Sequence, residues 1–164
     1  KSTGEVMGVG KTFGEAFIKS QLGAGVRLPR AGLVVLSVKQ SDKPRMVAVA
    51  RSLLALGFSL AATKGTAAAI QAAGMDCKAV NKVAEGRPHI VDMIKNDEVV
   101  LVINTVEERR NAIADSRQIR TSALQARVTT YTTMAGAEAA VDGMQYLDHL
   151  GVISVQEMHA QLLA

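Results

Sequence analysis

The chain has 164 residues and a net charge of +4, with 48% hydrophobic and 21% charged residues. This length suits one globular domain with a short appendage. The small positive charge, without basic runs that carry interleaved aromatic residues, excludes nucleic acid as the main partner. The single cysteine, Cys77, excludes a disulfide framework and a thiolate metal cluster, and is expected to be a core residue.

The sequence also predicts where in the cell the protein lies. No stretch approaches the run of about 20 apolar residues that crosses a bilayer, so we expect neither a membrane span nor a membrane partner. The chain does not open with a charged segment followed by an apolar one, so we expect a cytoplasmic protein. Because it begins with Lys1 and not with methionine, we expect it to be a piece of a longer chain.

The first 28 residues are predicted to form a separate unit. Apolar residues recur at helical spacing over residues 11–22, and Thr12 with Glu15 fits a capping box at the start of that helix. Glycines at residues 23 and 25 end the helix, and Pro29 ends a linker. We therefore expect residues 1–28 to be the tail of a preceding domain and residues 29–164 to form the main domain.

The main domain alternates short apolar runs with amphipathic segments. Strands are predicted at residues 32–38, 58–62, 77–80, 99–103 and 128–131. Helices are predicted between Pro44 and Gly57 and over residues 66–73, 88–95, 116–126, 135–147 and 155–163. The pattern predicts an α/β fold of three layers: a Rossmann-like, five-stranded parallel sheet flanked by helices. Ligands bind such sheets at the carboxyl ends of the strands.

Donors of hydrogen bonds and positive charge follow the predicted strands at that edge. Hydroxyl groups, lysines, amides and a glycine at a helix start are the groups that bind a phosphate monoester. The candidate residues are Ser37, Lys43, Thr63, Lys64, Gly65, Thr66, Lys82, Asn104 and Thr105. A structural interpretation stays open, in which each threonine caps a helix and each lysine is solvated.

Catalytic and metal sites are not predicted. No Ser/His/Asp or Cys/His set and no carboxylate pair falls at the ligand edge, and His89, His149 and His159 lack the spacing of metal ligands. Arg87 lies in a polar loop and either closes the pocket or faces solvent. Asp115 either caps the helix predicted to begin at residue 116 or holds a cationic ligand.

Several of these segments together resemble one family. They are Val9-Gly10-Lys11-Thr12-Phe13-Gly14-Glu15-Ala16, Thr63-Lys64-Gly65-Thr66, Asn81-Lys82-Val83 with Glu85-Gly86-Arg87-Pro88, Ile103-Asn104-Thr105, Asp115-Ser116-Arg117 with Ile119-Arg120, and Ile153-Ser154-Val155-Gln156-Glu157-Met158. In this order they look like the C-terminal end of the large chain in the bacterial carbamoyl-phosphate synthase family. The resemblance covers the whole chain, with residues 1–28 similar to the end of a synthetase domain and the rest similar to a methylglyoxal-synthase-like regulatory domain.

The resemblance implies a regulatory function. The longer chain would be an ATP-dependent ligase, with Mg²⁺ and K⁺ as further candidates, that makes carbamoyl phosphate for pyrimidine and arginine synthesis. Its partners would include a glutamine amidotransferase small chain, while this part would carry no cofactor and no catalytic group. UMP or IMP would bind at the nine candidate residues above, and ornithine at Asp115, Thr130 and Thr132.

The sequence also departs from the family. Lys64 stands where the family often has histidine, and the loop from Val106 to Asn111 is one residue longer. No equivalent of the catalytic aspartate of methylglyoxal synthases is found. Two alternatives stay open beside nucleotide sensing: a lyase that acts on a triose phosphate, and a structural module through which copies of the synthase associate.

Overall fold

The computed structural model describes residues 5–106 and 110–163, so part of the loop between Val106 and Asn111 lies outside the described residues. The strands are β1 (Leu33–Ser37), β2 (Ser59–Thr63), β3 (Lys78–Val80), β4 (Val99–Asn104) and β5 (Thr129–Tyr131). The helices are α1 (Phe13–Gly23), α2 (Lys43–Ala55), α3 (Lys64–Ala72), α4 (Ile90–Lys95), α5 (Arg110–Gln125), α6 (Met134–Met144) and α7 (Val155–Leu163). Two short 3-10 turns, η1 (Gln40–Asp42) and η2 (Val83–Glu85), follow β1 and β3.

The five strands form one parallel sheet in the order β3-β2-β1-β4-β5, which confirms the predicted fold class. Strands β2 and β3 lie on one side of β1, and the chain then crosses to place β4 and β5 on the other side. The direction of winding therefore changes between β1 and β4, where Ser37 pairs with Asn104 at the carboxyl ends. A crevice opens at such a point because the connections leave the two strands toward opposite faces.

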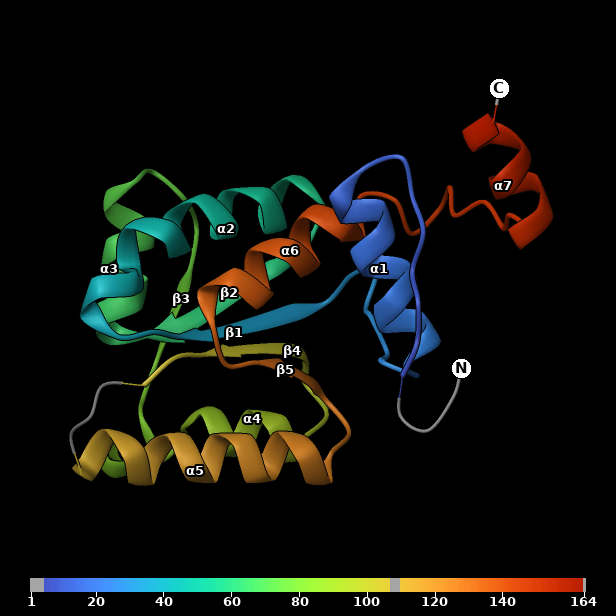
Figure 1. The fold of residues 1–164 in the computed structure, drawn as a ribbon. Coiled ribbons are helices and arrows are strands. Elements are labelled where there is room, and N and C mark those ends of the chain that lie inside the picture. Colours follow the sequence, from blue (N-terminus) through green and yellow to red (C-terminus); the bar gives the residue numbers. More distant parts are fainter. Residues whose placement is uncertain (1–4, 107–109, 164) are drawn as a thin grey trace.

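Helices cover both faces of the sheet, with α2, α3 and α6 on one face and α4 and α5 on the other (Figure 1). The central strands are apolar throughout because both of their faces are covered. Val34, Val35 and Leu36 of β1 have no exposed surface, and Leu101 and Val102 of β4 have none either. Cys77 is buried as expected, and burial raises the pKa of its thiol to about 11, so the thiol stays protonated at neutral pH.

Helix α1 packs against α6, although the predicted boundary at residues 28 and 29 separates the two. Ile18 is fully buried in the same core as α2 and α6, and Gly14 and Gly143 allow the two backbones to approach closely. Thr12 caps α1 as expected, because its hydroxyl accepts a hydrogen bond from the Glu15 amide at 3.2 Å. The carboxylate of Glu15 bonds the amide of Lys11 instead of that of Thr12.

Helices α1, α3, α4 and α5 begin two or more residues away from their predicted starts. Helix α4 begins at Ile90 instead of Pro88, because His89 caps it: the Asp92 amide donates to His89 Nδ1, and the His89 amide donates to the Asp92 carboxylate. Helix α5 begins at Arg110, six residues before the predicted start, so Asp115 lies inside the helix. The interpretation of Asp115 as a helix cap is therefore wrong, and its carboxylate contacts the η2 turn instead.

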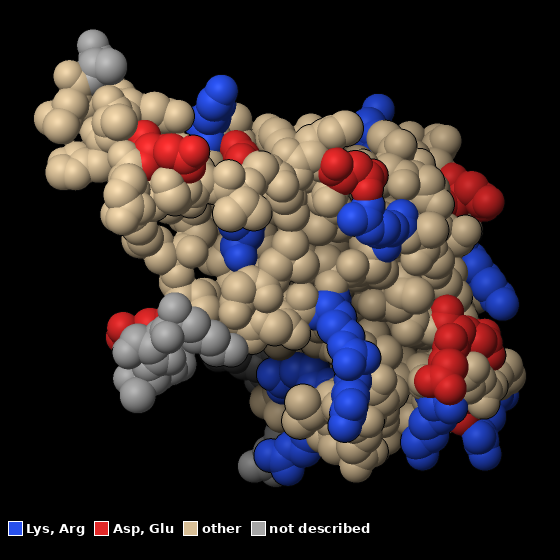
Figure 2. All heavy atoms as spheres, turned by 90° about the vertical axis from the view of Figure 1, so that its right-hand side faces the viewer, with Lys and Arg blue, Asp and Glu red and all other residues tan. Residues whose placement is uncertain are grey.

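Figure 2 views the molecule from the side of α1 and α7, where uncharged residues cover most of the surface and cations lie beside anions. Helix α7 stands apart from the sheet next to α1 (Figure 1). Phe13 and Val155 begin these two helices, and Met7 and Val152 precede them; all four are among the most exposed apolar side chains. None of the helices described here is both long enough and apolar enough to span a membrane.

Candidate functional site

A cavity of about 150 Å³ lies at the carboxyl ends of β1, β2 and β4, where the strand order changes direction. It collects eight of the nine residues predicted to bind a nucleotide. They are Ser37, Lys43, Thr63, Gly65, Thr66, Lys82, Asn104 and Thr105. Residues that follow four of the five predicted strands therefore line one cavity, whereas Thr132, which follows the fifth, does not.

Threonine hydroxyls on one side of the cavity are buried and fixed by the backbone. Thr66 is 1% exposed, and its hydroxyl accepts hydrogen bonds from the Val38 amide and the Thr63 hydroxyl, both at 3.3 Å. The hydroxyl of Thr105 accepts from the Lys39 amide at 3.1 Å. Because a hydroxyl has two acceptor positions and one proton, Thr66 and Thr105 can still donate to an anion in the cavity.

Amide and serine side chains hold the β1 and β4 ends together. Asn104 donates from its side-chain nitrogen to the Ser37 carbonyl at 3.2 Å. Ser116, from α5, donates to the side-chain oxygen of Asn104. Asn104 and Ser116 are 2% and 3% exposed, so this contact fixes the orientation of the amide and ties α5 to the cavity.

Positive charge reaches the cavity at the start of α3. Thr63 occupies the N-cap position of this helix, but its side chain makes no hydrogen bond to the first amides. Those amides and the helix dipole attract an anion. Gly65 brings the backbone close to Lys43, since a β-carbon at residue 65 would lie 3.2 Å from Lys43 Nζ. Lys82, just beyond the end of β3, is a second lysine that lines the cavity.

Lys64 is the one predicted nucleotide residue that does not line the cavity. Its side chain is 64% exposed, and Nζ lies 3.3 Å from the Glu85 carboxylate in the η2 turn. Partial burial opposes ionisation of Glu85, but hydrogen bonds from the Lys82 amide and from Lys64 outweigh it and lower the pKa of the Glu85 carboxyl. The ammonium group of Lys64 is thus already matched by a carboxylate.

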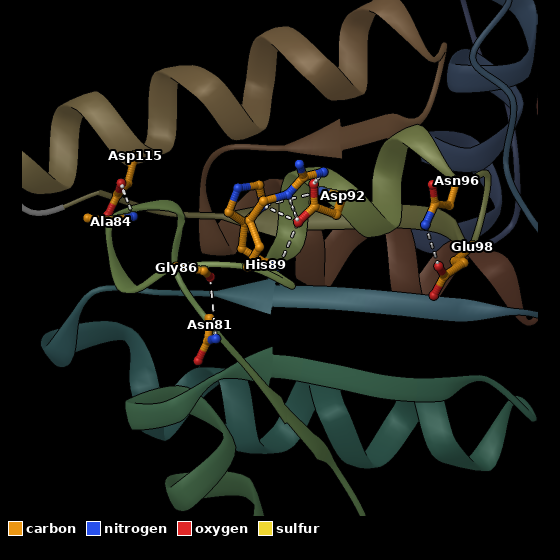
Figure 3. Close-up of polar contacts among 9 residues, drawn as sticks. Asn81, Ala84, Gly86, His89, Asp92, Asn96, Glu98 and Asp115 are labelled. Atoms are coloured by element: carbon orange, nitrogen blue, oxygen red, sulfur yellow. Dashed lines mark hydrogen bonds and ion pairs between the residues drawn. The ribbon is translucent and has the colours of Figure 1, made fainter.

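Asp115 lies in the cavity with the predicted nucleotide residues. Its Oδ1 accepts a hydrogen bond from the Ala84 amide at 3.3 Å, which joins α5 to the η2 turn (Figure 3). Thr130, predicted to share a ligand with Asp115, lines a different cavity of about 430 Å³, together with Gln21, Arg27 and Arg127. Thr132 is exposed at the end of β5. The structure does not bring the three predicted ornithine residues into one cavity.

Several other residues that line the cavity were not predicted from the sequence. Val38, Lys39 and Gln40 follow Ser37 at the end of β1, and Val106 follows Thr105 after β4. Extending each candidate segment by a few residues would have found them. Ser116 and Ile119 come from α5 and carry no such signal. Arg87 is not part of the cavity, since its guanidinium pairs with Asp92 and its side chain is 78% exposed.

No group of three or more His, Cys, Asp or Glu suited to a metal ion occurs among the residues that the structure describes. At the start of α4, the Asp92 carboxylate contacts both the Arg87 guanidinium and the His89 amide. Figure 3 shows Asp92 and His89 side by side. Since they satisfy one another and the α4 amides, they form a structural cap on that helix.

The chain is similar over its length to much longer proteins. It is 62% identical over 162 residues to "Carbamoyl phosphate synthase large chain" of Ralstonia nicotianae, 54% over 164 residues to that of Pseudomonas putida, and 52% over 162 residues to that of Neisseria meningitidis serogroup A. These alignments cover 99–100% of this chain but only 15% of each relative.

A solved structure and a family model agree with the observed fold. A methylglyoxal synthase from Elizabethkingia anophelis superposes with a TM-score of 0.56 at 19% identity, over 70% of this chain and 79% of that one. The model of the MGS-like domain matches residues 45–132, which run from α2 to just beyond β5 and include most of the cavity. The chain belongs to the MGS-like domain family.

Proposed function

We propose that this chain is the C-terminal regulatory domain of a carbamoyl phosphate synthase large chain, and that its cavity binds a nucleoside 5′-monophosphate, UMP or IMP. The observation that carries the proposal is the meeting of Lys43, Lys82 and the start of α3 in one cavity at the change in strand direction. Backbone amides and lysines at a helix start recognise the phosphate of such ligands.

The rest of the cavity suits a sugar. Asp115 accepts hydrogen bonds, as ribose hydroxyls require, and Val106 and Ile119 offer apolar surface to a base. In this proposal Asp115 contacts the nucleotide. Ornithine contacts Thr130 and Thr132 at β5, with further acidic groups supplied by the synthetase domain of the longer chain.

The longer chain would be an ATP-dependent ligase with Mg²⁺, and with K⁺ as a further candidate, working with a glutamine amidotransferase small chain. The domain would act by linkage, since a nucleotide that binds one arrangement of the enzyme better shifts the equilibrium toward it. A coupling of about 1–3 kcal/mol is typical of such regulation. This part of the enzyme carries no catalytic step in the proposal.

Calorimetric titration of the chain with UMP, IMP and uridine tests the proposal. We expect UMP to bind at least about tenfold more tightly than uridine, and its affinity to fall as salt is raised, because charge-assisted contacts to the phosphate dominate. Thr105→Ala should weaken UMP binding by about 1.5–3 kcal/mol if its hydroxyl donates to the phosphate. Equal affinities for UMP and uridine would refute a phosphate site.

A second candidate function rests on the carboxylate of Asp115. A lyase that acts on a triose phosphate needs a base beside a phosphate site, and Asp115 shares the cavity with Lys43 and Gly65. Incubation with dihydroxyacetone phosphate and an assay for methylglyoxal separates this candidate from a binding function. Turnover that is lost in Asp115→Asn would establish the lyase.

A further inference from the structure

A short turn carries Lys82 from the end of β3 to the cavity. We call residues 82–86 the Lys82 turn; it consists of Lys82, the 3-10 turn η2 and Gly86. One side of the turn contacts α3 through Glu85 and Lys64, and the other contacts α5 through Ala84 and Asp115. Helices α3 and α5 cover opposite faces of the sheet (Figure 1), so the turn bridges the two layers beside the cavity.

Polar contacts and the packing of Val83 against the core hold the Lys82 turn, and Glu85 makes two of the polar contacts. Its carboxylate accepts a hydrogen bond from the Lys82 amide at 3.2 Å and lies 3.3 Å from Lys64 Nζ. The other polar side-chain contacts described for the turn are the Ala84 amide with Asp115 and the Asn81 side chain with the Gly86 carbonyl, both at 3.3 Å (Figure 3). Glu85 therefore fixes the backbone of Lys82, a residue that lines the cavity.

We infer that Glu85 is a positioning residue for anion binding, which holds Lys82 at the cavity by anchoring the Lys82 turn to Lys64. The inference rests on the proposed binding of a phosphate group. It assigns Lys64 a different part from the one predicted from sequence: Lys64 acts on the ligand through Glu85 and does not contact the phosphate.

If charge alone decided the affinity, a chain without Glu85 would bind phosphate more tightly, whereas the inference predicts weaker binding. The direction of the change in affinity therefore tests the inference. The negative charge of Glu85 is matched by Lys64 at 3.3 Å, and both side chains are partly exposed, so water and salt screen its effect on the ligand. Loss of the contact to the Lys82 amide, by contrast, frees the backbone that orients a flexible lysine.

The decisive variant is Glu85→Ala, titrated with UMP and with uridine. We expect UMP affinity to fall by about five- to tenfold, as for other misplaced charged contacts, and uridine affinity to stay within about twofold. The matched control is Glu98→Ala, which removes an exposed carboxylate that bonds Asn96 just before β4, away from Ala84 and Asp115 (Figure 3). It makes the same change in net charge and should leave UMP affinity within about twofold.

A second pair of variants separates an indirect from a direct role for Lys64. Lys64→Met should weaken UMP binding in the natural chain but have no further effect in the Glu85→Ala background, because the two residues act as one unit. If Glu85→Ala does not fold, Glu85→Gln keeps an acceptor for the Lys82 amide and should still weaken UMP binding by about two- to threefold. Thermal unfolding of the same samples shows whether each variant is folded.

The outcomes are distinct. Unchanged or tighter UMP binding by a folded Glu85→Ala or Glu85→Gln chain overturns the inference, and so does an equal loss for UMP and uridine. An additive effect of Lys64→Met in the double variant also overturns it, because Lys64 then contacts the ligand directly. If the natural chain itself does not bind UMP, the proposed function fails before any variant is compared.

Discussion

Gly65 lies directly against the side chain of Lys43, so close that a β-carbon at residue 65 would come within 3.2 Å of the ammonium nitrogen. The first turn of α3 and a lysine of α2 thus meet at the cavity without a side chain between them. Their contact gives the proposed phosphate site both backbone amides and a positive charge. It is possible because residue 65 has no β-carbon.

Gly65→Ala should weaken UMP binding without destabilising the fold. The added methyl group displaces Lys43 Nζ and narrows the approach to the α3 amides, so we expect affinity to fall about tenfold, the effect of losing about one charged hydrogen bond. Alanine is a better helix former than glycine by up to about 1 kcal/mol, so the melting temperature should stay level or rise. Calorimetry and thermal unfolding measure the two effects.

The control for this change is Gly151→Ala, because a β-carbon at residue 151 meets no atom within 4 Å. It should change neither UMP affinity nor the melting temperature appreciably. Full UMP affinity in Gly65→Ala would mean that the phosphate does not bind at the start of α3.

Gly143→Ala should destabilise the protein through the contact of α1 with α6. A β-carbon at residue 143 would lie 2.9 Å from the Gly14 carbonyl oxygen and 2.9 Å from the Ile18 β-carbon. Because backbone atoms cannot rotate away, α1 must shift and expose part of Ile18. We expect the free energy of unfolding, measured with urea, to fall by about 1–3 kcal/mol.

Gly151→Ala again serves as the control, with an expected change within about 0.5 kcal/mol. A Gly143→Ala chain as stable as the natural one would show that α1 contributes little to the core. In that case residues 1–28 would behave as the separate unit that the sequence predicted.

The sequence predicted the parts of the site that follow strands, because buried parallel strands have a strong local signature. The apolar runs around Val34 and Val102 place Ser37 and Asn104 at one edge before any contact is known. The position of Asp115 could not be predicted in this way, since it depends on how early α5 begins and on a contact with Ala84, 31 residues away in the chain. The pairing of Lys64 with Glu85 is likewise a tertiary contact without local signal.

Protonation of Asp92 should lower the free energy of unfolding in acid. The Arg87 guanidinium, helped by the His89 amide, lowers the pKa of the Asp92 carboxyl from 3.8 to about 2 against the effect of burial. Since the folded pKa lies below the unfolded one, the carboxylate stabilises the fold above about pH 4, and this contribution is lost as the pH falls toward 2. Asp92→Asn should therefore be less stable than the natural chain at pH 6 and close to it at pH 2.

Urea unfolding of both chains at several pH values measures this difference. Glu98→Gln, which changes the exposed carboxylate that bonds Asn96, controls for loss of one negative charge. A constant stability difference between Asp92→Asn and the natural chain from pH 6 to pH 2 would rule out the ionised contact as its source.

Asp115→Asn should alter nucleotide binding and leave ornithine binding unchanged. Asp115 shares a cavity with Lys43 and Thr66, whereas Thr130 lines another cavity beside Arg27 and Arg127. Arginines repel the two ammonium groups of ornithine, so we expect this chain alone to bind it with a Kd above about 1 mM. Asparagine keeps an acceptor for the Ala84 amide but binds ribose hydroxyls less strongly than a carboxylate, so UMP affinity should fall about fivefold.

Calorimetry with UMP, inorganic phosphate and ornithine separates these effects, since binding of inorganic phosphate should not weaken when a nearby negative charge is removed. Submillimolar ornithine binding that disappears in Asp115→Asn would instead assign Asp115 to the ornithine site, as the resemblance implied.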